Sequence, residues 1–269
     1  MKQSPSPLFI AARTLLFMVT LLFIAALTLL FMVILLVLSY PASSGQAEGQ
    51  DLIVLPTIPP TPTVPPAPTP PVGLAAPQSA MLATEQFDTD GALARWQIVD
   101  LEDVPAERRS LWIVADGRLR QDRTVPPLRD PSIHETAALT GDANWSDYTI
   151  SASFYDQDNA NVGLIVRYRN GSYYRYRIIR DDYEDRPKHV IERVVDGSAT
   201  VLASLDAPGY EPRRWNTIMF SVNGDQLRAF FNGQATMEVR DAHLSSGSAG
   251  LYTRAIGGML FDNVMITSP

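Results

Sequence analysis

The chain has 269 residues, a formal net charge of −7 and no cysteine. The absence of cysteine excludes a disulfide framework, a thiolate zinc site and a cysteine nucleophile. The negative charge argues against a nucleic-acid partner, which needs a basic surface. The histidines have no metal-ligand spacing, and they are His134, His189 and His243.

A long apolar run is the first element along the chain. Residues 14–38 contain no charged side chain. At about 1.5 Å per residue, a helix of this length reaches roughly 38 Å and crosses a hydrocarbon core about 30 Å thick. We therefore predict a transmembrane helix over residues 14–38, preceded by a short N-terminal segment, residues 1–13.

The charges on either side of this run predict its orientation. Lys2 and Arg13 precede the run, whereas the first charges after it are Glu48 and Asp51. Because positive residues stay on the cytoplasmic side, residues 1–13 are expected in the cytoplasm and the rest of this single-pass protein outside the plasma membrane. The alternative is a secreted protein cleaved at the small residues around Gln46.

Residues 39–79 form a stalk rich in proline and threonine. Its centre, residues 56–77, reads PTIPPTPTVPPAPTPPVGLAAP, which favours an extended polyproline II conformation over a packed core. At about 3.1 Å per residue, this part would reach roughly 70 Å. We interpret the stalk as an extracytoplasmic spacer, and the alternative for its PxxP pattern is a ligand for an SH3-type domain.

Residues 80–269 show short segments of alternating polar and apolar residues instead of helical periodicity. Examples are DYTISASFY, NVGLIVRYR and WNTIMFSV. About ten or more such segments predict an all-β domain, either a two-sheet antiparallel sandwich or a barrel. Pairs of turn residues separate the segments, and they are Asp116-Gly117, Asn170-Gly171, Asp196-Gly197, Asn223-Gly224 and Asn232-Gly233.

One predicted hairpin shows how burial of one face selects a register. We expect strands over residues 161–169 and 173–179, joined by a three-residue loop. Arg167 then lies opposite Arg175, and Ile165 lies opposite Arg177. The core side of the hairpin carries Leu164, Val166, Tyr168, Tyr174, Tyr176 and Ile178. The exposed side, called here the arginine–tyrosine face, carries Arg167, Arg169, Tyr173, Arg175 and Arg177.

An ordered set of motifs resembles a known superfamily. The set includes Trp96-Gln97-Ile98-Val99, Asp116-Gly117-Arg118-Leu119, Gly163-Leu164-Ile165-Val166-Arg167-Tyr168, Asn223-Gly224-Asp225, Gly250-Leu251-Tyr252 and Phe261-Asp262-Asn263-Val264. It resembles the concanavalin A-like lectin/glucanase (LamG-like jelly-roll) superfamily, particularly members related to family 16 glycoside hydrolases and keto-disaccharide hydrolases. The resemblance covers about residues 84–267 and implies a two-sheet antiparallel jelly-roll sandwich.

The sequence lacks the catalytic motif of the family 16 enzymes. In that family an alternating Glu-x-Asp-x-Glu strand supplies the two carboxyl groups of a retaining glycosidase, and no such motif occurs here. The acidic cluster Asp181, Asp182, Glu184 and Asp185 is interpreted as a solvated loop. We therefore assign no catalytic residue and favour a non-catalytic domain. The alternative is an enzyme of the keto-disaccharide hydrolase type whose carboxylates are unidentified.

The arginine–tyrosine face is the candidate ligand site. Aromatic rings stack on the apolar faces of sugars, and guanidinium groups hydrogen-bond hydroxyls or pair with carboxylates. Such a face would suit acidic glycans such as uronic-acid polymers. The alternative is an ordinary solvated sheet face, on which the arginine stems cover the tyrosines.

The resemblance also implies a structural calcium ion where the last strand meets the first. Carried over to this sequence, the ligands are the Asp262 carboxylate and backbone carbonyls near Asp88 and Gly117. Oxygen ligands of this kind are what calcium requires. The alternative is that Asp262 hydrogen-bonds neighbouring backbone amides.

These inferences combine into one hypothesis, a membrane-anchored extracytoplasmic lectin-like module. Its expected ligand is a glycan or another component of the cell envelope. The alternatives are the hydrolase-like enzyme and a purely structural adhesion module. The sequence leaves the identity of the ligand and the oligomeric state open.

Overall fold

The structure is a computed structural model that describes residues 64–68, 80–123, 134–157, 160–180, 187–255 and 257–269. The predicted transmembrane helix over residues 14–38 and the acidic cluster at residues 181–185 lie outside these ranges. No helix among the described residues is long and apolar enough to cross a membrane.

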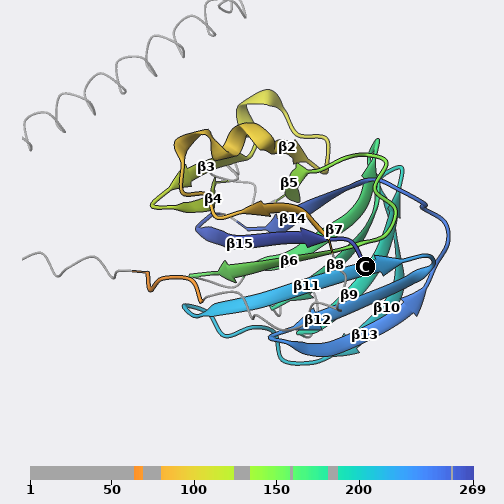
Figure 1. The fold of residues 1–269 in the computed structure, drawn as a ribbon. Helices are drawn as coiled ribbons and strands as arrows, with labels where there is room; N and C mark the ends of the chain where they lie inside the picture. The colour runs from red at the N-terminus through yellow and green to blue at the C-terminus, as the bar shows by residue number, and fades with distance from the viewer. Residues whose placement is uncertain (1–63, 69–79, 124–133, 158–159, 181–186, 256) are drawn as a thin grey trace, which may run out of the picture. The chain divides into compact units, whose positions relative to one another are not determined.

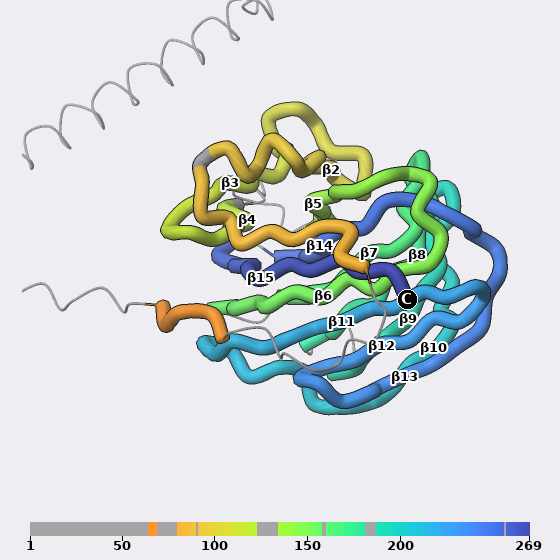
Figure 2. The backbone as a smooth tube through the Cα atoms, in the orientation of Figure 1, coloured from red at the N-terminus to blue at the C-terminus, as the bar shows by residue number. Residues whose placement is uncertain are grey.

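The domain is built from two antiparallel sheets (Figures 1 and 2). Sheet 1 has the order β13-β12-β11-β6-β15-β4-β3, with β1 paired to β15, and sheet 2 has the order β10-β9-β8-β7-β14-β5-β2. The strands of sheet 1 are β1 (Met81–Glu85), β3 (Leu111–Ala115), β4 (Arg118–Arg123), β6 (Tyr148–Tyr155), β11 (Trp215–Asn223), β12 (Gln226–Phe231), β13 (Gln234–Arg240) and β15 (Met259–Thr267). Those of sheet 2 are β2 (Gln97–Asp100), β5 (Thr136–Thr140), β7 (Asn161–Arg169), β8 (Ser172–Ile179), β9 (Lys188–Val195), β10 (Ser198–Asp206) and β14 (Ser248–Arg254).

Two short 3-10 helices, η1 (Asp90–Arg95) and η2 (Ala106–Arg108), lie on either side of β2 in the sequence. The predicted all-β, two-sheet antiparallel architecture is therefore confirmed. Because strands that follow one another in the chain often lie in different sheets, side chains from distant segments meet on each face.

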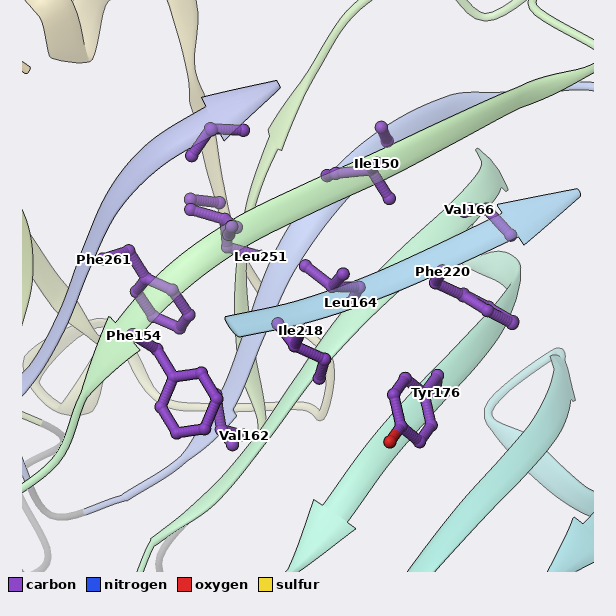
Figure 3. Close-up of a cluster of buried hydrophobic side chains, with 14 of the residues drawn as sticks. Ile150, Phe154, Val162, Leu164, Val166, Tyr176, Ile218, Phe220, Leu251 and Phe261 are labelled. Atoms are coloured by element: carbon purple, nitrogen blue, oxygen red, sulfur yellow. The ribbon is translucent and has the colours of Figure 1, made fainter. Parts of the chain in front are cut away.

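The core lies between the two sheets and follows from strand alternation. In β11 every second side chain is buried, including Ile218, Phe220 and Val222, while the residues between them remain partly exposed. Figure 3 shows how Phe154 and Phe261 of sheet 1 gather with Leu164 and other side chains of sheet 2. Full burial of each large apolar side chain contributes roughly 1.5–3 kcal/mol, so this cluster can stabilise the domain without disulfides.

Type I′ turns connect several of the hairpins. This turn needs a positive φ at both central residues, which glycine adopts freely and Asn or Asp tolerates. At the predicted pair Asn223-Gly224 only the glycine has a positive φ, of 55°. The pairs with a positive φ at both positions are Asp116-Gly117, Asn170-Gly171, Asp196-Gly197 and Asn232-Gly233.

The register of the β7–β8 hairpin differs from the prediction. The turn contains two residues, not three, because Arg169 pairs directly with Ser172. Arg175 consequently lies opposite Ile165, where the prediction had placed Arg177. A type I′ turn matches the twist of the strands it joins, which favours the shorter loop.

A β-bulge in β7 compensates for the shorter turn. The register shifts between Val166 and Arg169, and Arg167 takes a left-handed conformation with a φ of 53°. The extra residue therefore sits in the strand and not in the turn. The prediction was correct that Leu164 and Val166 face the core, but it was wrong about Tyr168, which packs on the opposite side of sheet 2.

Candidate functional site

The bulge removes Arg167 from the predicted arginine–tyrosine face. Its side chain is only 3% exposed. Its guanidinium donates hydrogen bonds to the carbonyl oxygens of Ser146 (2.9 Å) and Leu244 (2.7 Å) and to Oδ1 of Asp147 (3.1 Å). Arg167 thus joins the loops before β6 and before β14, and we assign it a structural role.

Arg169 also lies apart from the rest of the predicted face. It is exposed, and its Nη2 donates to the carbonyl oxygen of Ala143 (2.9 Å) and to Oδ1 of Asn144 (3.2 Å). The structure keeps Tyr173, Arg175 and Arg177 together on the outer face of sheet 2, the face that points away from sheet 1. The prediction that this side is exposed was wrong for Tyr173 and Arg175, which are each only 2% exposed. Tyr168 joins them there by stacking on Tyr173, with ring centroids 5.7 Å apart.

Arg175 is the centre of this outer face and is paired with two glutamates. Its Nη1 lies 2.5 Å from Oε2 of Glu135, which directly precedes β5. Its Nε and Nη2 lie 2.9 and 2.8 Å from Oε2 of Glu192 in β9. The side chains of Arg175 and Glu192 are each 3% exposed, so a buried charge is matched by a buried counter-charge.

Arg177 completes the ion-pair network. Its Nε donates to Oε2 of Glu192 at 2.9 Å and its Nη2 donates to Oε1 at 3.0 Å, a bidentate arrangement. Its Nη1 lies 3.8 Å from Oε1 of Glu135. The side chains of Arg177 and Glu135 are 15% and 17% exposed, so these two form the more accessible part of the network.

Tyr252 of β14 contacts both Glu135 and Arg175 of the network. Its hydroxyl donates to Oε1 of Glu135 at 2.7 Å, and the Arg175 guanidinium lies 4.6 Å from its ring centroid. The ring lies over Gly163, where an added Cβ would come within 3.0 Å of the ring and 2.3 Å of the Tyr176 carbonyl oxygen. Glycine at this position therefore makes room for the aromatic ring. We call Glu135, Arg175, Arg177, Glu192 and Tyr252 the Glu–Arg cluster.

The electrostatics of the cluster hold Glu135 in its ionised form. Burial alone would raise its pKa, but the charges and hydrogen bonds of Arg175, Tyr252 and Arg177 outweigh it, so the pKa of Glu135 is lowered. Burial raises the pKa of Tyr252 well above its usual value, which keeps the hydroxyl protonated as a donor. The two arginines balance the two glutamates, and the four groups carry no net charge.

The sequence prediction missed Glu135, Glu192 and Tyr252. The available signal was the presence of Arg175 and Arg177 on one side of a strand whose other side is apolar. Such a pair needs buried carboxylates on neighbouring strands. Glu192 lies between Val190 and Val194 in the alternation of β9, which also marks it as a polar residue on an otherwise apolar face.

His134 and Asp100 form a separate pair on the core side of sheet 2. Nε2 of His134 lies 3.0 Å from Oδ1 of Asp100. Asp100 is paired in register with Thr136, whose hydroxyl accepts a hydrogen bond from the indole of Trp112 in sheet 1. The intervening sheet separates this pair from the Glu–Arg cluster.

The residues predicted to bind calcium come together at the β3–β4 turn and the bulge of β15. Oδ1 of Asp88 lies 3.7 Å from the position that a Cβ on Gly117 would occupy. Burial, together with the charge of Asp88, raises the pKa of Asp262. The backbone amide of Asn263 donates to Oδ1 of Asp262 at 2.7 Å, so the hydrogen-bonded alternative is also realised.

These carboxylates do not form a metal site by themselves. Within the described residues, no group of three or more His, Cys, Asp or Glu side chains could hold a metal ion. A cation here would need backbone carbonyls as additional ligands. The carboxylate oxygens of Asp88 and Asp262 are nevertheless of the ligand type that calcium prefers.

The fold is that of a two-sheet jelly-roll-like sandwich, and the family that matches it places the domain in the carbohydrate-binding or glycosidase-like class. A family model described as "3-keto-alpha-glucoside-1,2-lyase-like domain" matches residues 83–267, and the chain belongs to this family. The resemblance to keto-disaccharide hydrolase domains of the concanavalin A-like superfamily is thereby confirmed. A search of curated proteins finds no match.

Several solved structures share the fold. A beta-glucanase from Bacillus licheniformis aligns with a TM-score of 0.50 at 10% identity, covering 71% of this chain and 100% of its own. The carbohydrate recognition domain of Emp47p aligns with a TM-score of 0.50 at 11% identity, covering 73% and 99%. A Bacillus subtilis protein described as having a galectin-like fold aligns equally well at 11% identity, covering 71% and 99%. At these identities the likeness shows the fold alone.

Proposed function

We propose that this protein is a membrane-anchored, extracytoplasmic module that binds a neutral glycan on the outer face of sheet 2 without cleaving it. The apolar run at residues 14–38 and the positive residues before it support the anchor and its orientation. The family of the domain supports a sugar ligand. The position of the Glu–Arg cluster supports binding on the outer face of sheet 2. The ion pairing of its carboxylates supports a domain without catalytic activity.

The ion pairing of both carboxylates is the observation that carries the proposal. A glycosidase needs one carboxyl group whose pKa is raised so that it can donate a proton at neutral pH. The pKa of Glu135 is lowered instead. Glu192 accepts hydrogen bonds from two guanidinium groups and is almost fully buried. Both carboxylates therefore serve as fixed hydrogen-bond acceptors in a rigid network.

The balance of charge favours a neutral sugar over the acidic glycans expected from the sequence. The positive charges of Arg175 and Arg177 are already paired with glutamates, so an acidic ligand would have to displace a buried carboxylate. Val201 of β10 lies opposite Glu192 and is 58% exposed, which adds an apolar surface beside the cluster. Apolar and polar groups side by side suit the two kinds of surface that a sugar ring presents.

A glycan array with the detergent-solubilised full chain tests this proposal. We expect binding to neutral gluco-oligosaccharides above binding to uronic-acid oligosaccharides, with the signal lost in Arg177→Met. Arg169→Met is the matched control, because Arg169 is exposed and lies off the outer face. Equal losses in the two variants, or a preference for uronic acids that survives Arg177→Met, would argue against the proposal.

An enzyme of the type named in the family description is the second candidate. Glu135 favours it, since this carboxylate is the more accessible of the two and is hydrogen-bonded to a tyrosine hydroxyl. Incubation of the full chain with a 3-keto-α-glucoside tests it by release of the aglycone. Turnover that disappears in Glu135→Gln would establish this candidate and would show that the non-catalytic proposal is wrong.

We further propose that a calcium ion binds near Asp262, Asp88 and Gly117 and has a structural role. The support is the pKa of Asp262, which burial and the charge of Asp88 raise. A bound cation would offset the cost of ionising this carboxylate. The ion would also join β15 to the β3–β4 turn through oxygen ligands.

A further inference from the structure

A short piece of the stalk lies on sheet 1, at the ends of β6 and β11 (Figure 2). The indole Nε1 of Trp215 donates a hydrogen bond of 2.6 Å to the carbonyl oxygen of Pro65, and Nη2 of Arg118 reaches the same oxygen at 3.5 Å. The amide Nδ2 of Asn263 donates to the carbonyl oxygen of Pro68 at 2.9 Å. Three side chains that are distant in sequence thus converge on two stalk carbonyls.

The geometry of these contacts fits a polyproline II segment. Such a helix has three residues per turn and makes no internal hydrogen bonds, so its carbonyls are free acceptors. Pro65 and Pro68 are three residues apart, which places their carbonyls on one side of the helix, about 9 Å from each other. The groups that meet them are all N–H donors, which suits prolines, since these supply a carbonyl acceptor but no N–H donor.

Aromatic and cationic side chains build the surface on which the segment lies. The ring of Trp215 packs against Tyr155, its register partner in β6, with centroids 5.5 Å apart. The guanidinium of Arg118 lies 5.7 Å from the centroid of the Trp215 ring. Aromatic surfaces with an indole N–H donor are a recurring way to recognise proline-rich segments. We call Arg118, Tyr155, Trp215 and Asn263 the Trp215 corner.

The connection back to the domain keeps the contact intramolecular. The domain begins at Ala80, whose backbone is hydrogen-bonded to Ser268 at the end of sheet 1. Only residues 69–79 separate Pro68 from this anchor point. A short linker of this kind supplies an effective concentration on the order of millimolar, so even a weak contact remains formed.

We propose that the Trp215 corner is a polyproline-binding site and that its occupant is the chain's own stalk segment Val64–Pro68. The stalk is then held against the domain for part of its length instead of being free from residue 39 to residue 79. Release of the segment would add residues 64–79 to the free tether, an extension of roughly 50 Å at about 3.1 Å per residue. On the membrane anchor proposed above, on which this step rests, occupancy of this site sets how far the domain can reach from the membrane.

The sequence of the stalk offers a second copy of the same pattern. Residues 64–68 read VPPAP, and residues 58–62 read IPPTP, six residues earlier. Six residues are two turns of a polyproline II helix, so the sequence repeats the pattern at a spacing that this conformation would place on one side. Both copies must therefore be changed if the stalk itself is mutated, and variants of the corner give the simpler test.

A fluorescent label on the stalk tests the contact in the full chain. The protein has no cysteine, so Thr69→Cys provides a single site for bimane, whose fluorescence tryptophan quenches at short range. We expect a dim label in the parent and a several-fold brighter label in Trp215→Phe. This variant keeps an aromatic ring but loses the indole, which is both the N–H donor and the strong quencher. Asn263→Gly keeps the tryptophan and the left-handed backbone of Asn263, and should also brighten the label. Trp145→Phe is the matched control and should change nothing.

A peptide competition separates binding from quenching. A synthetic VPPAP peptide in excess should brighten the label in a saturable way, whereas a VGGAG peptide should not. Equal brightness in the parent and in Asn263→Gly, or no effect of the VPPAP peptide, would overturn the proposal. Brightening on mixing with excess unlabelled Trp215→Phe chain would also overturn it, because the labelled stalk would then exchange onto the corner of a second copy.

Discussion

Removal of the charge of Glu192 is expected to destabilise the domain strongly. Glu192→Gln keeps the size of the side chain but removes the counter-charge of both Arg175 and Arg177. Glu192 accepts contacts of 2.9 and 2.8 Å from Arg175 and of 2.9 and 3.0 Å from Arg177. Arg175 would then remain buried with Glu135 as its one carboxylate partner in the Glu–Arg cluster.

The expected loss follows from the burial of the pair. Breaking a buried ion pair on one side costs about 3–5 kcal/mol, because the partner charge stays buried without compensation. For a domain of this size, 1 kcal/mol corresponds to about 2–4 °C in Tm, so the expected drop is roughly 6–20 °C. An exposed ion pair contributes at most about 1 kcal/mol.

Urea unfolding of the full chain in detergent, followed by tryptophan fluorescence, measures this loss. The matched control is Glu238→Gln, since Glu238 is paired with Arg228 at 3.4 Å on the surface and both side chains are about half exposed. We expect the midpoint to fall in Glu192→Gln and to stay close to the parent value in the control. Equal midpoints for the two variants would refute the view that the Glu–Arg cluster is a rigid buried network.

Four further results are expected. Because the folded-state pKa of Glu135 is lowered, its contribution to stability is present above the unfolded value of about 4.3 and is lost as the pH falls through the folded pKa. The difference in unfolding free energy between the parent and Glu135→Gln should therefore shrink in acid, and a constant difference would show that the carboxylate charge is unimportant. Calcium should raise the Tm of the parent and leave that of Asp262→Asn unchanged, whereas a shift of the same size in both would place the ion elsewhere. Gly163→Ala should lower the Tm and weaken glycan binding together, because the Cβ clashes with the Tyr176 carbonyl oxygen and crowds the ring of Tyr252; normal binding would contradict the role given to this contact. Protease added to intact cells should remove the domain, and full protection would show that the predicted orientation is wrong.

The sequence was sufficient to predict the architecture because two local signals agree. Alternating burial, as in β11, has the period of a strand, and the Asn-Gly and Asp-Gly pairs mark tight hairpins. The sequence was less informative where a strand lacks β-branched and aromatic residues. β5 reads TAALT and is almost entirely buried, yet its alanines give no strand signal of their own.

The candidate site was predicted only in part, for reasons that lie in the topology. Arg175 and Arg177 were placed on one face correctly, because alternation within β8 decides this. Their partners lie far away in sequence, since Glu135 is 40 residues from Arg175. The neighbours of β8 depend on the strand order of sheet 2. Hairpin signals in the sequence do not reveal that order. Arg167 was misplaced because a bulge, unlike a turn, left no recognisable pattern in the sequence.

The contact between the stalk and the Trp215 corner could not be predicted from the sequence either. The proline-rich composition of the stalk predicts an extended segment, and composition alone favours a free spacer. The contact depends on donors from β4, β11 and β15, which only the folded domain brings together. A spacer and a bound ligand can therefore be the same segment.

A crystal structure of the chain with a neutral gluco-oligosaccharide bound tests the central claim most directly. We expect the sugar on the outer face of sheet 2, with hydroxyl groups within hydrogen-bond distance of Glu135 and Arg177 and a ring near Val201. A sugar bound to sheet 1 or to the loops, with the Glu–Arg cluster untouched, would contradict the proposed site.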